Sequence, residues 1–174
     1  MRYRRSNISG ASYFFTVNLA ERDKTLLVDH VAHLREVIKS VKGNHPFVID
    51  AMVIMPDHLH AIWTLPEGDA DFSTRWGLVK SGFSRGIPND ERISKSRCLK
   101  GERGIWQRRF WEHLILNDED YQRHVDYIHY NPVKHGYVTM PSAWPWSSLH
   151  RYIKQGVIAP DWATVAQSDG SFGE

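Results

Sequence analysis

Residues 47–65 read FVIDAMVIMPDHLHAIWTL, two apolar runs on either side of Pro56 and Asp57. Both runs are rich in β-branched and other apolar residues, which is typical of strands, and Pro-Asp favours a turn between them. We therefore expect strands over residues 47–55 and 58–65 that pair as a β-hairpin. The first run is apolar enough to be a central strand of a sheet.

The other elements follow from hydrophobic spacing outside this hairpin. Further strands are predicted at 13–19 and within 106–115, and helices at 29–42, 72–85, 118–131 and 147–154. Asp29 and Gly43 are expected to cap the first helix, and Pro132 should stop the helix 118–131. Residues 86–104 lack an apolar period and predict an exposed loop. This order of strands and helices predicts an α+β, ferredoxin-like fold, an antiparallel sheet with helices on one face, followed by a C-terminal tail.

The composition is that of one globular domain. The chain has 174 residues, of which 41% are hydrophobic and 24% charged. We expect a single domain over residues 1–174, with a core at about 10–137 and a C-terminal extension over 138–174. Cys98 is the only cysteine, which excludes an internal disulfide or a cysteine-based zinc site. No apolar run approaches the ~20 residues of a membrane span, so we expect a cytoplasmic protein with no membrane partner.

Two histidines at the start of the second hairpin strand are candidate metal ligands. His58 and His60 are two residues apart, and side chains on a strand alternate between its faces with period two. Both imidazoles should therefore point to the same side of the sheet. Two imidazoles on a rigid strand supply most of a metal site and require a third ligand from elsewhere in the chain.

The helix predicted at 118–131 offers that third ligand. Tyr121, Val125 and Ile128 form its core-facing stripe, and Tyr127 and Asn131, four residues apart, share a second face beside it. The amide oxygen of Asn131 can serve as a neutral ligand. Two imidazoles and one amide oxygen leave positions for water and phosphate oxygens, which suits Mg²⁺ or Mn²⁺ better than a closed structural zinc site.

Tyr127 is the candidate nucleophile. A tyrosine oxygen can cut a phosphodiester by bonding to phosphorus, which conserves the bond energy for a later rejoining step. A phenol is a weak nucleophile at its free pKa of ~10, and a metal that polarises the phosphate makes the attack feasible. The products would be a 5′-phosphotyrosine and a free 3′ hydroxyl. Tyr130, three residues later, is the main competing nucleophile.

These motifs resemble those of a known family. His58-Leu59-His60 resembles the HUH motif, and residues 127–136, YIHYNPVKHG, resemble the tyrosine-helix signature of the REP-associated tyrosine transposases, a branch of the single-tyrosine HUH transposases. Similarity also covers residues 13–18, 63–66, 110–113 and 144–148. The resemblance implies a divalent metal and the cutting and joining of single-stranded DNA at hairpins formed by repetitive extragenic palindromes. It matches His58 and His60 to the metal-binding histidines, Tyr127 to the nucleophile and Asn131 to the third ligand.

Basic residues indicate a DNA surface. Between Arg75 and Arg109 there are ten basic and three acidic residues, a local net charge of +7 against +2 for the whole chain. Such an excess favours contact with a phosphate backbone of single-stranded DNA or a DNA hairpin, and hence association with the nucleoid. The predicted DNA-contacting residues are Arg2, Arg4, Arg5, Arg75, Lys80, Arg85, Arg108, Arg109 and Lys134.

Two other function classes remain open from the residues alone. One is a non-catalytic protein that binds DNA hairpins, and the other is a metal-dependent hydrolase of a small phosphoester with water as the nucleophile. Glu112 and His113 are expected either to be structural or to support the metal site. We expect a monomer rather than a homodimer, because the C-terminal tail could cover the surface through which single-tyrosine relatives pair.

Overall fold

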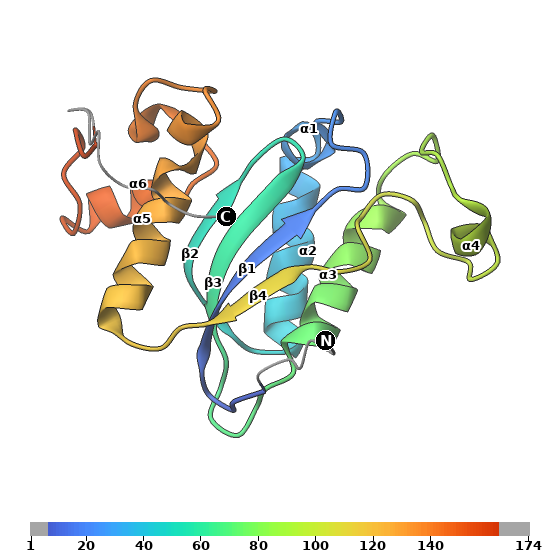
Figure 1. The fold of residues 1–174 in the computed structure, drawn as a ribbon, viewed down its shortest axis with the longest axis horizontal. Helices are drawn as coiled ribbons and strands as arrows, with labels where there is room; N and C mark the ends of the chain where they lie inside the picture. Colours follow the sequence, from blue (N-terminus) through green and yellow to red (C-terminus); the bar gives the residue numbers. More distant parts are fainter. Residues whose placement is uncertain (1–6, 164–174) are drawn as a thin grey trace, which may run out of the picture.

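The computed structural model describes residues 7–163 and contains one four-stranded antiparallel sheet (Figure 1). Its strands are β1 (Ser12–Asn18), β2 (Val48–Ile54), β3 (His58–Thr64) and β4 (Trp111–Leu114), in the order β2-β3-β1-β4. This is the ferredoxin-like order, so the predicted fold class and the β2–β3 hairpin are confirmed. The central strands are β1 and β3, which pair along their whole length.

Strand β2 is an edge strand, and the prediction that it is central is wrong. Its apolar character has another cause, because both of its faces are covered: Ile54 packs in one hydrophobic cluster and Val53 in the other. Its free edge is covered as well. The C-terminal segment bonds to it through Trp146 and Ser148, and Val53 forms a bridge with Ser147.

The larger core lies between the sheet and two helices on one face. Helices α2 (Val31–Asn44) and α3 (Phe72–Arg85) pack there side by side, after a short turn of helix, α1 (Leu26–Asp29). Asp71 caps α3 by accepting a hydrogen bond from the backbone N–H of Thr74. Asp29 does not cap α2, which begins at Val31 and continues through Gly43.

Helix α5 (Asp118–Lys134) covers the opposite face of the sheet, so the prediction that all helices share one face is wrong for this element (Figure 1). The second face is also apolar, and Val125 and Ile128 of α5 pack on it in a cluster with Phe14 and Ile62. Pro132 lies inside α5 and does not stop it. The helix ends instead near Gly136, which has a positive φ of 73°.

Beyond α5 the chain forms a short 3₁₀ helix, η1 (Pro141–Ala143), and α6 (Leu149–Lys154). Residues 86–104 extend away from the sheet and include one further short helix, α4 (Lys95–Cys98) (Figure 1). Over residues 7–163, no helix combines the length and the apolar character needed to cross a membrane.

Arg103 braces the base of this long loop. Its guanidinium donates to the backbone carbonyls of Ser84, Ile87 and Pro88 and to the carboxylate of Glu91 at 2.5 and 2.8 Å. The hydrogen bond from Arg103 lowers the pKa of Glu91 to about 2. The loop is therefore exposed, as predicted, but anchored at its base.

We predict that Arg103→Met lowers the free energy of unfolding by about 2 kcal/mol at pH 7, because several charge-assisted hydrogen bonds are lost. The folded-state pKa of Glu91 lies below its ordinary value of 4.5, so this stabilisation is present above that value and declines as the pH falls toward about 2. Urea unfolding at pH 7 and pH 3 measures both effects. Arg92→Met, which changes an exposed neighbour, is the control; equal stability of wild type and Arg103→Met at pH 7 would contradict the brace.

Candidate active site and metal centre

The two candidate histidines lie together on β3, under helix α5. His58 and His60 are 3% and 4% exposed, and their ring centroids are 5.0 Å apart. Strand β3 pairs with β1 on one side and with β2 on the other, which holds both residues on a rigid backbone. The predicted orientation of both imidazoles to the same side of the sheet is confirmed, because both rings contact residues from the same helix.

Each histidine is oriented through its Nδ1 atom. The Nδ1 of His58 is 2.7 Å from a carboxylate oxygen of Asp57, which Arg22 also holds, and the Nδ1 of His60 is 2.8 Å from the hydroxyl of Thr16. A bonded Nδ1 leaves Nε2 as the ligand nitrogen, the usual arrangement of a metal-binding histidine and its supporting partner. Asp57, Arg22 and Thr16 did not emerge from the sequence as site residues, although Asp57 adjoins His58.

The protonation states of Asp57 and His60 suit the binding of a cation. Burial alone would raise the pKa of Asp57, but hydrogen bonds from His58 and Arg22 outweigh it and hold that pKa below its usual value. Asp57 is therefore an ionised acceptor for the His58 ring. Burial lowers the pKa of His60 well below its ordinary value, with the positive charge on neighbouring groups adding to the effect, so His60 is neutral at physiological pH.

Two residues of α5 and its C-cap residue His135, spaced four apart, face the histidine pair. The ring of Tyr127 lies 5.1 Å from that of His60, and the ring of His135 lies 5.1 Å from that of His58. Asn131 is midway between Tyr127 and His135 on this row of the helix, so its side chain lies over the pair. Among residues 7–163, Tyr130 makes no ring contact with His58 or His60. Tyr127 is therefore the tyrosine better placed to act at the histidine pair.

Asn131 is the clearest sign of a missing ligand. It is fully buried, and neither its amide oxygen nor its amide nitrogen has a hydrogen-bond partner among the described residues. An unsatisfied buried amide costs about 1–3 kcal/mol, which a protein rarely accepts without a function. Two imidazoles and this amide oxygen form a donor set that fits a divalent cation with open coordination positions.

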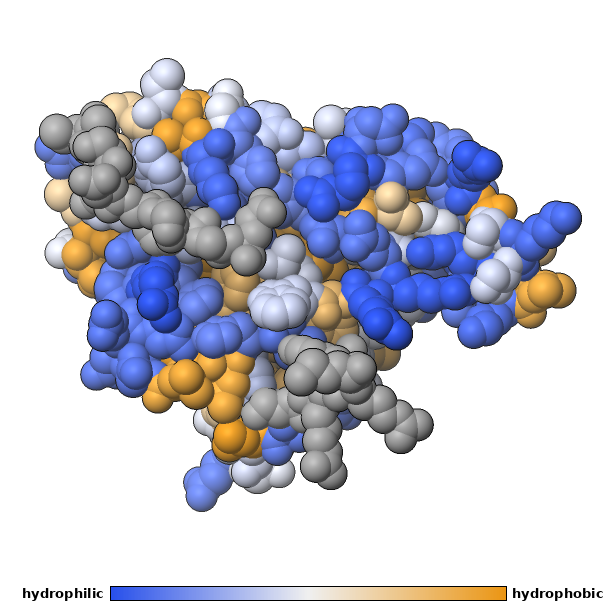
Figure 2. Space-filling model, viewed as in Figure 1, coloured by the Kyte–Doolittle hydropathy of each residue, from blue (hydrophilic) through white to orange (hydrophobic). Residues whose placement is uncertain are grey.

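Eight of the nine predicted DNA-contacting residues fall into three groups. Lys80, Arg85 and Arg108 line one hollow between α3 and residues 101–108, on a lobe whose visible face is largely hydrophilic (Figure 2). Arg109 and Lys134 are exposed, and Lys134 lies 4.9 Å from the centre of the Tyr127 ring. Arg2, Arg4 and Arg5 lie outside the described residues.

Arg75 is a correction to the predicted DNA surface. It is 3% exposed and donates to the carboxylate of Asp69 and to the backbone carbonyls of His45, Pro46 and Asp71. Its charge is therefore neutralised inside the protein, where it joins two loops, and it cannot reach a phosphate.

Neither Glu112 nor His113 supports the histidine pair. Glu112 pairs with Phe15 on the sheet face that packs against α2 and α3, away from His58. His113 points to the other face but bonds to Asp120 near the start of α5.

The fold and this juxtaposition of a buried histidine pair with a helix-borne tyrosine and amide define the class: a transposase with a single candidate tyrosine nucleophile. The family model described as "Transposase IS200 like" matches residues 7–131. The REP-associated tyrosine transposase of Escherichia coli (strain K12) is 48% identical over 92% of this chain and 90% of its own length. A protein of Haemophilus influenzae is 45% identical over 92% of both chains.

A solved structure agrees with these relatives. The REP-associated tyrosine transposase bound to a REP hairpin superposes on this chain with a TM-score of 0.83, at 46% identity, covering 100% of this chain and 97% of the other. The chain therefore belongs to the IS200-like transposase family and, within it, to the REP-associated tyrosine transposases. This family implies a divalent metal, and the donor set at His58, His60 and Asn131 fits one.

We predict that Asn131→Leu leaves the metal-free protein at least as stable as wild type, and up to about 2 kcal/mol more stable, because it removes an unsatisfied buried amide. The same variant should bind Mn²⁺ at least about tenfold more weakly, because a ligand oxygen is lost. Urea unfolding without metal and calorimetric titration with Mn²⁺ measure the two effects.

Asn131→Asp provides the matched control. It keeps an oxygen ligand but buries a charge, so it should be destabilised without metal and restored by Mn²⁺. Unchanged Mn²⁺ affinity in Asn131→Leu would exclude the amide as a ligand.

Proposed function

We propose that this transposase cuts and joins single-stranded DNA at REP-type hairpins, with Tyr127 as the nucleophile and with His58, His60 and Asn131 as ligands of a Mg²⁺ or Mn²⁺ ion. The observation that carries the proposal is the ring contact of Tyr127 with His60. One helical turn after Tyr127, on the same face of α5, lies the unsatisfied buried amide of Asn131. The relative whose solved structure holds a REP hairpin supports the choice of DNA substrate.

In this proposal the chain's own groups position the reacting atoms. The Tyr127 oxygen attacks the scissile phosphorus, the bond from phosphorus to the 3′ oxygen breaks, and the 5′ phosphate stays on the tyrosine. Lys134, whose ammonium group lies beside the Tyr127 ring, places positive charge near the phosphate. The bound ion would polarise the phosphate and stabilise the charge that develops on the leaving oxygen. Attack by a 3′ hydroxyl on the phosphotyrosine reverses the step and joins the strands.

We also propose that the catalytic unit is a monomer. The histidines on β3 and the tyrosine on α5 meet within one chain, so no second copy is needed to complete the site. Light scattering on the purified protein tests this; a dimer that persists at nanomolar concentration would contradict it.

The direct test of catalysis is a denaturing gel with a single-stranded REP hairpin and Mn²⁺. A 3′-labelled strand should become covalently attached to the protein, because the 5′ phosphate of the downstream fragment is transferred to tyrosine. A 5′-labelled strand should instead give a shorter free product. Tyr127→Phe should abolish both signals, a loss of at least about 10³-fold in rate, while Tyr130→Phe keeps them.

Other results of this gel would revise the proposal in different ways. Loss only in Tyr130→Phe would preserve the reaction but move the nucleophile by one turn of helix. If wild type binds the hairpin but forms no adduct, the protein is a non-catalytic hairpin binder. Cleavage without an adduct would favour water as the nucleophile.

Two exposed arginines of the predicted DNA surface, Arg85 in the hollow and Arg109 outside it, yield a separate prediction for binding. Arg85→Gln and Arg109→Gln should each reduce the slope of log K against log salt concentration by about 1, because each exposed arginine displaces roughly one counterion from DNA. Fluorescence anisotropy with a labelled hairpin at several salt concentrations measures the slope. Arg35→Gln, which alters an exposed arginine of α2 outside the hollow, is the control. A slope unchanged in both test variants would place the DNA elsewhere.

A further inference from the structure

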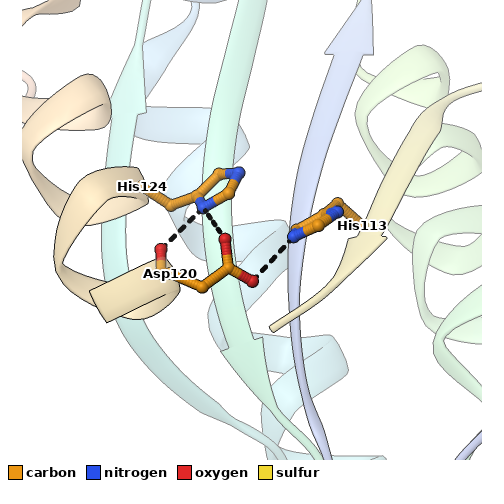
Figure 3. Close-up of side chains that lie close together, drawn as sticks. All are labelled: His113, Asp120 and His124. Carbon is orange, nitrogen blue, oxygen red and sulfur yellow. Dashed lines mark hydrogen bonds and ion pairs between the residues drawn. The ribbon is translucent and has the colours of Figure 1, made fainter. Parts of the chain in front are cut away.

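A second group of metal-ligating side chains lies beside the active site, where β4 meets the start of α5 (Figure 3). His113 comes from β4, and Asp120 and His124 come from successive turns of α5. One donor atom from each residue lies within 4.8 Å of the others. The Nε2 of His113 is 2.8 Å from one Asp120 carboxylate oxygen, and the Nδ1 of His124 is 3.1 Å from the other. The two imidazole rings stack at 4.7 Å.

The charge states of these groups suit a cation. Hydrogen bonds from Leu116, His113 and Arg123 outweigh the effect of burial and lower the pKa of Asp120 far below its usual value, so it is ionised at neutral pH. Burial lowers the pKa of His124, so its ring is neutral and has a lone pair to offer. Two imidazoles and one carboxylate are a common ligand set for zinc, with water in the fourth position.

We propose that His113, Asp120 and His124 bind a transition metal ion of the Zn²⁺ type, at a site distinct from the one formed by His58, His60 and Asn131. This inference goes beyond the proposed DNA reaction and does not depend on it. The two sites differ in their oxygen ligand, a carboxylate here and an amide at Asn131. Two imidazoles with one carboxylate are an established zinc ligand set, and it is the imidazoles that favour Zn²⁺ or Co²⁺ over Mg²⁺.

The present geometry needs only small changes to accept the ion. Ligand atoms bound to zinc at about 2.0–2.1 Å in a tetrahedron lie roughly 3.3 Å apart. The His113 and His124 nitrogens lie 2.8 and 3.1 Å from different oxygens of Asp120, and one donor atom from each residue lies within 4.8 Å of the others. His113 Nε2 now makes a hydrogen bond to the Asp120 carboxylate, whereas the hydrogen bond of His124 Nδ1 goes to the Asp120 backbone carbonyl at 2.8 Å. On metal binding the neutral His124 ring would carry its proton on Nε2, which frees Nδ1 for the ion.

Arg123 is the group that opposes a cation here. Its guanidinium donates to Asp120 at 2.8 Å, but its side chain is 60% exposed and can turn toward solvent. The backbone N–H of Leu116 also donates to Asp120 and would remain in place as a supporting hydrogen bond. Removal of the Arg123 charge should therefore strengthen metal binding, an effect that a purely structural cluster would not predict.

A metal here would act on the helix that carries the nucleophile. His124 is three residues before Tyr127, and Phe14 contacts both rings, at 4.7 Å and 5.9 Å between centroids. An ion shared by β4 and α5 would hold the first turns of α5 to the sheet. It would thereby restrict the motion of Tyr127 relative to the histidine pair.

The test uses tag-free, full-length protein carrying His58→Ala and His60→Ala, which removes the two imidazoles of the other proposed metal site. Co²⁺ is titrated and its visible absorption recorded, and the melting temperature is measured with and without Zn²⁺. On this background we compare His113→Gln, His124→Gln, Arg123→Gln and, as the control, His45→Gln, which changes an exposed histidine elsewhere.

We expect one Co²⁺ per chain on this background and a higher melting temperature with Zn²⁺. His113→Gln and His124→Gln should each weaken binding at least about tenfold, while Arg123→Gln should strengthen it and His45→Gln should not change it. Absence of Co²⁺ binding, or undiminished Co²⁺ binding in both His113→Gln and His124→Gln, would overturn the proposal. If the double-alanine background does not fold, the wild-type protein decides: loss of one Co²⁺ per chain in His113→Gln supports the site, and equal Co²⁺ stoichiometry in both proteins overturns it.

Discussion

The packing of helix α5 on the second face of the sheet is the contact on which the rest of the site depends. Val125 and Ile128 are buried there against Phe14 and Ile62, and each such side chain contributes about 1.5–3 kcal/mol when fully buried. Tyr127 lies between Val125 and Ile128 in the sequence, at a fixed angle around the helix axis from both. Burial of these two side chains therefore also sets the position of the tyrosine. An apolar contact therefore determines where the polar chemistry can occur.

The C-terminal segment completes this arrangement by closing the open edge of β2. An exposed edge strand offers unpaired backbone groups, and here Trp146 and Ser148 bond to them, while the Trp144 indole donates to the carbonyl of Ile54. The Ser148 hydroxyl also bonds to His129 of α5, which burial keeps neutral by lowering its pKa to about 4. The tail thus joins the sheet edge to the tyrosine helix.

The elements were predictable where local rules decide them. Period-two alternation was enough to place His58 and His60 on one side of β3, and hydrophobic spacing was enough to predict α3 over residues 72–85. The face on which α5 packs was not predictable, because a stripe of valine and isoleucine fits either apolar face of the sheet equally well. Counting charges likewise could not identify Arg75 as buried. Its hydrogen-bond partners lie in loops, and only the tertiary structure brings those loops close to Arg75.

The buried amide of Asn131, which has no hydrogen-bond partner among the described residues, explains why this site is built on a packed helix and a central strand. A buried polar group without a partner favours any movement that brings it to water, and a loop would make that movement at little cost. Asn131 cannot move in this way, because its helix is held by the Val125 and Ile128 stripe and its histidine neighbours lie on a strand paired along both edges. An ion that accepts the amide oxygen would relieve this local instability only in the folded state. Metal affinity and folding stability are therefore coupled through one side chain, and the scaffold stabilises in advance the geometry that the reaction requires.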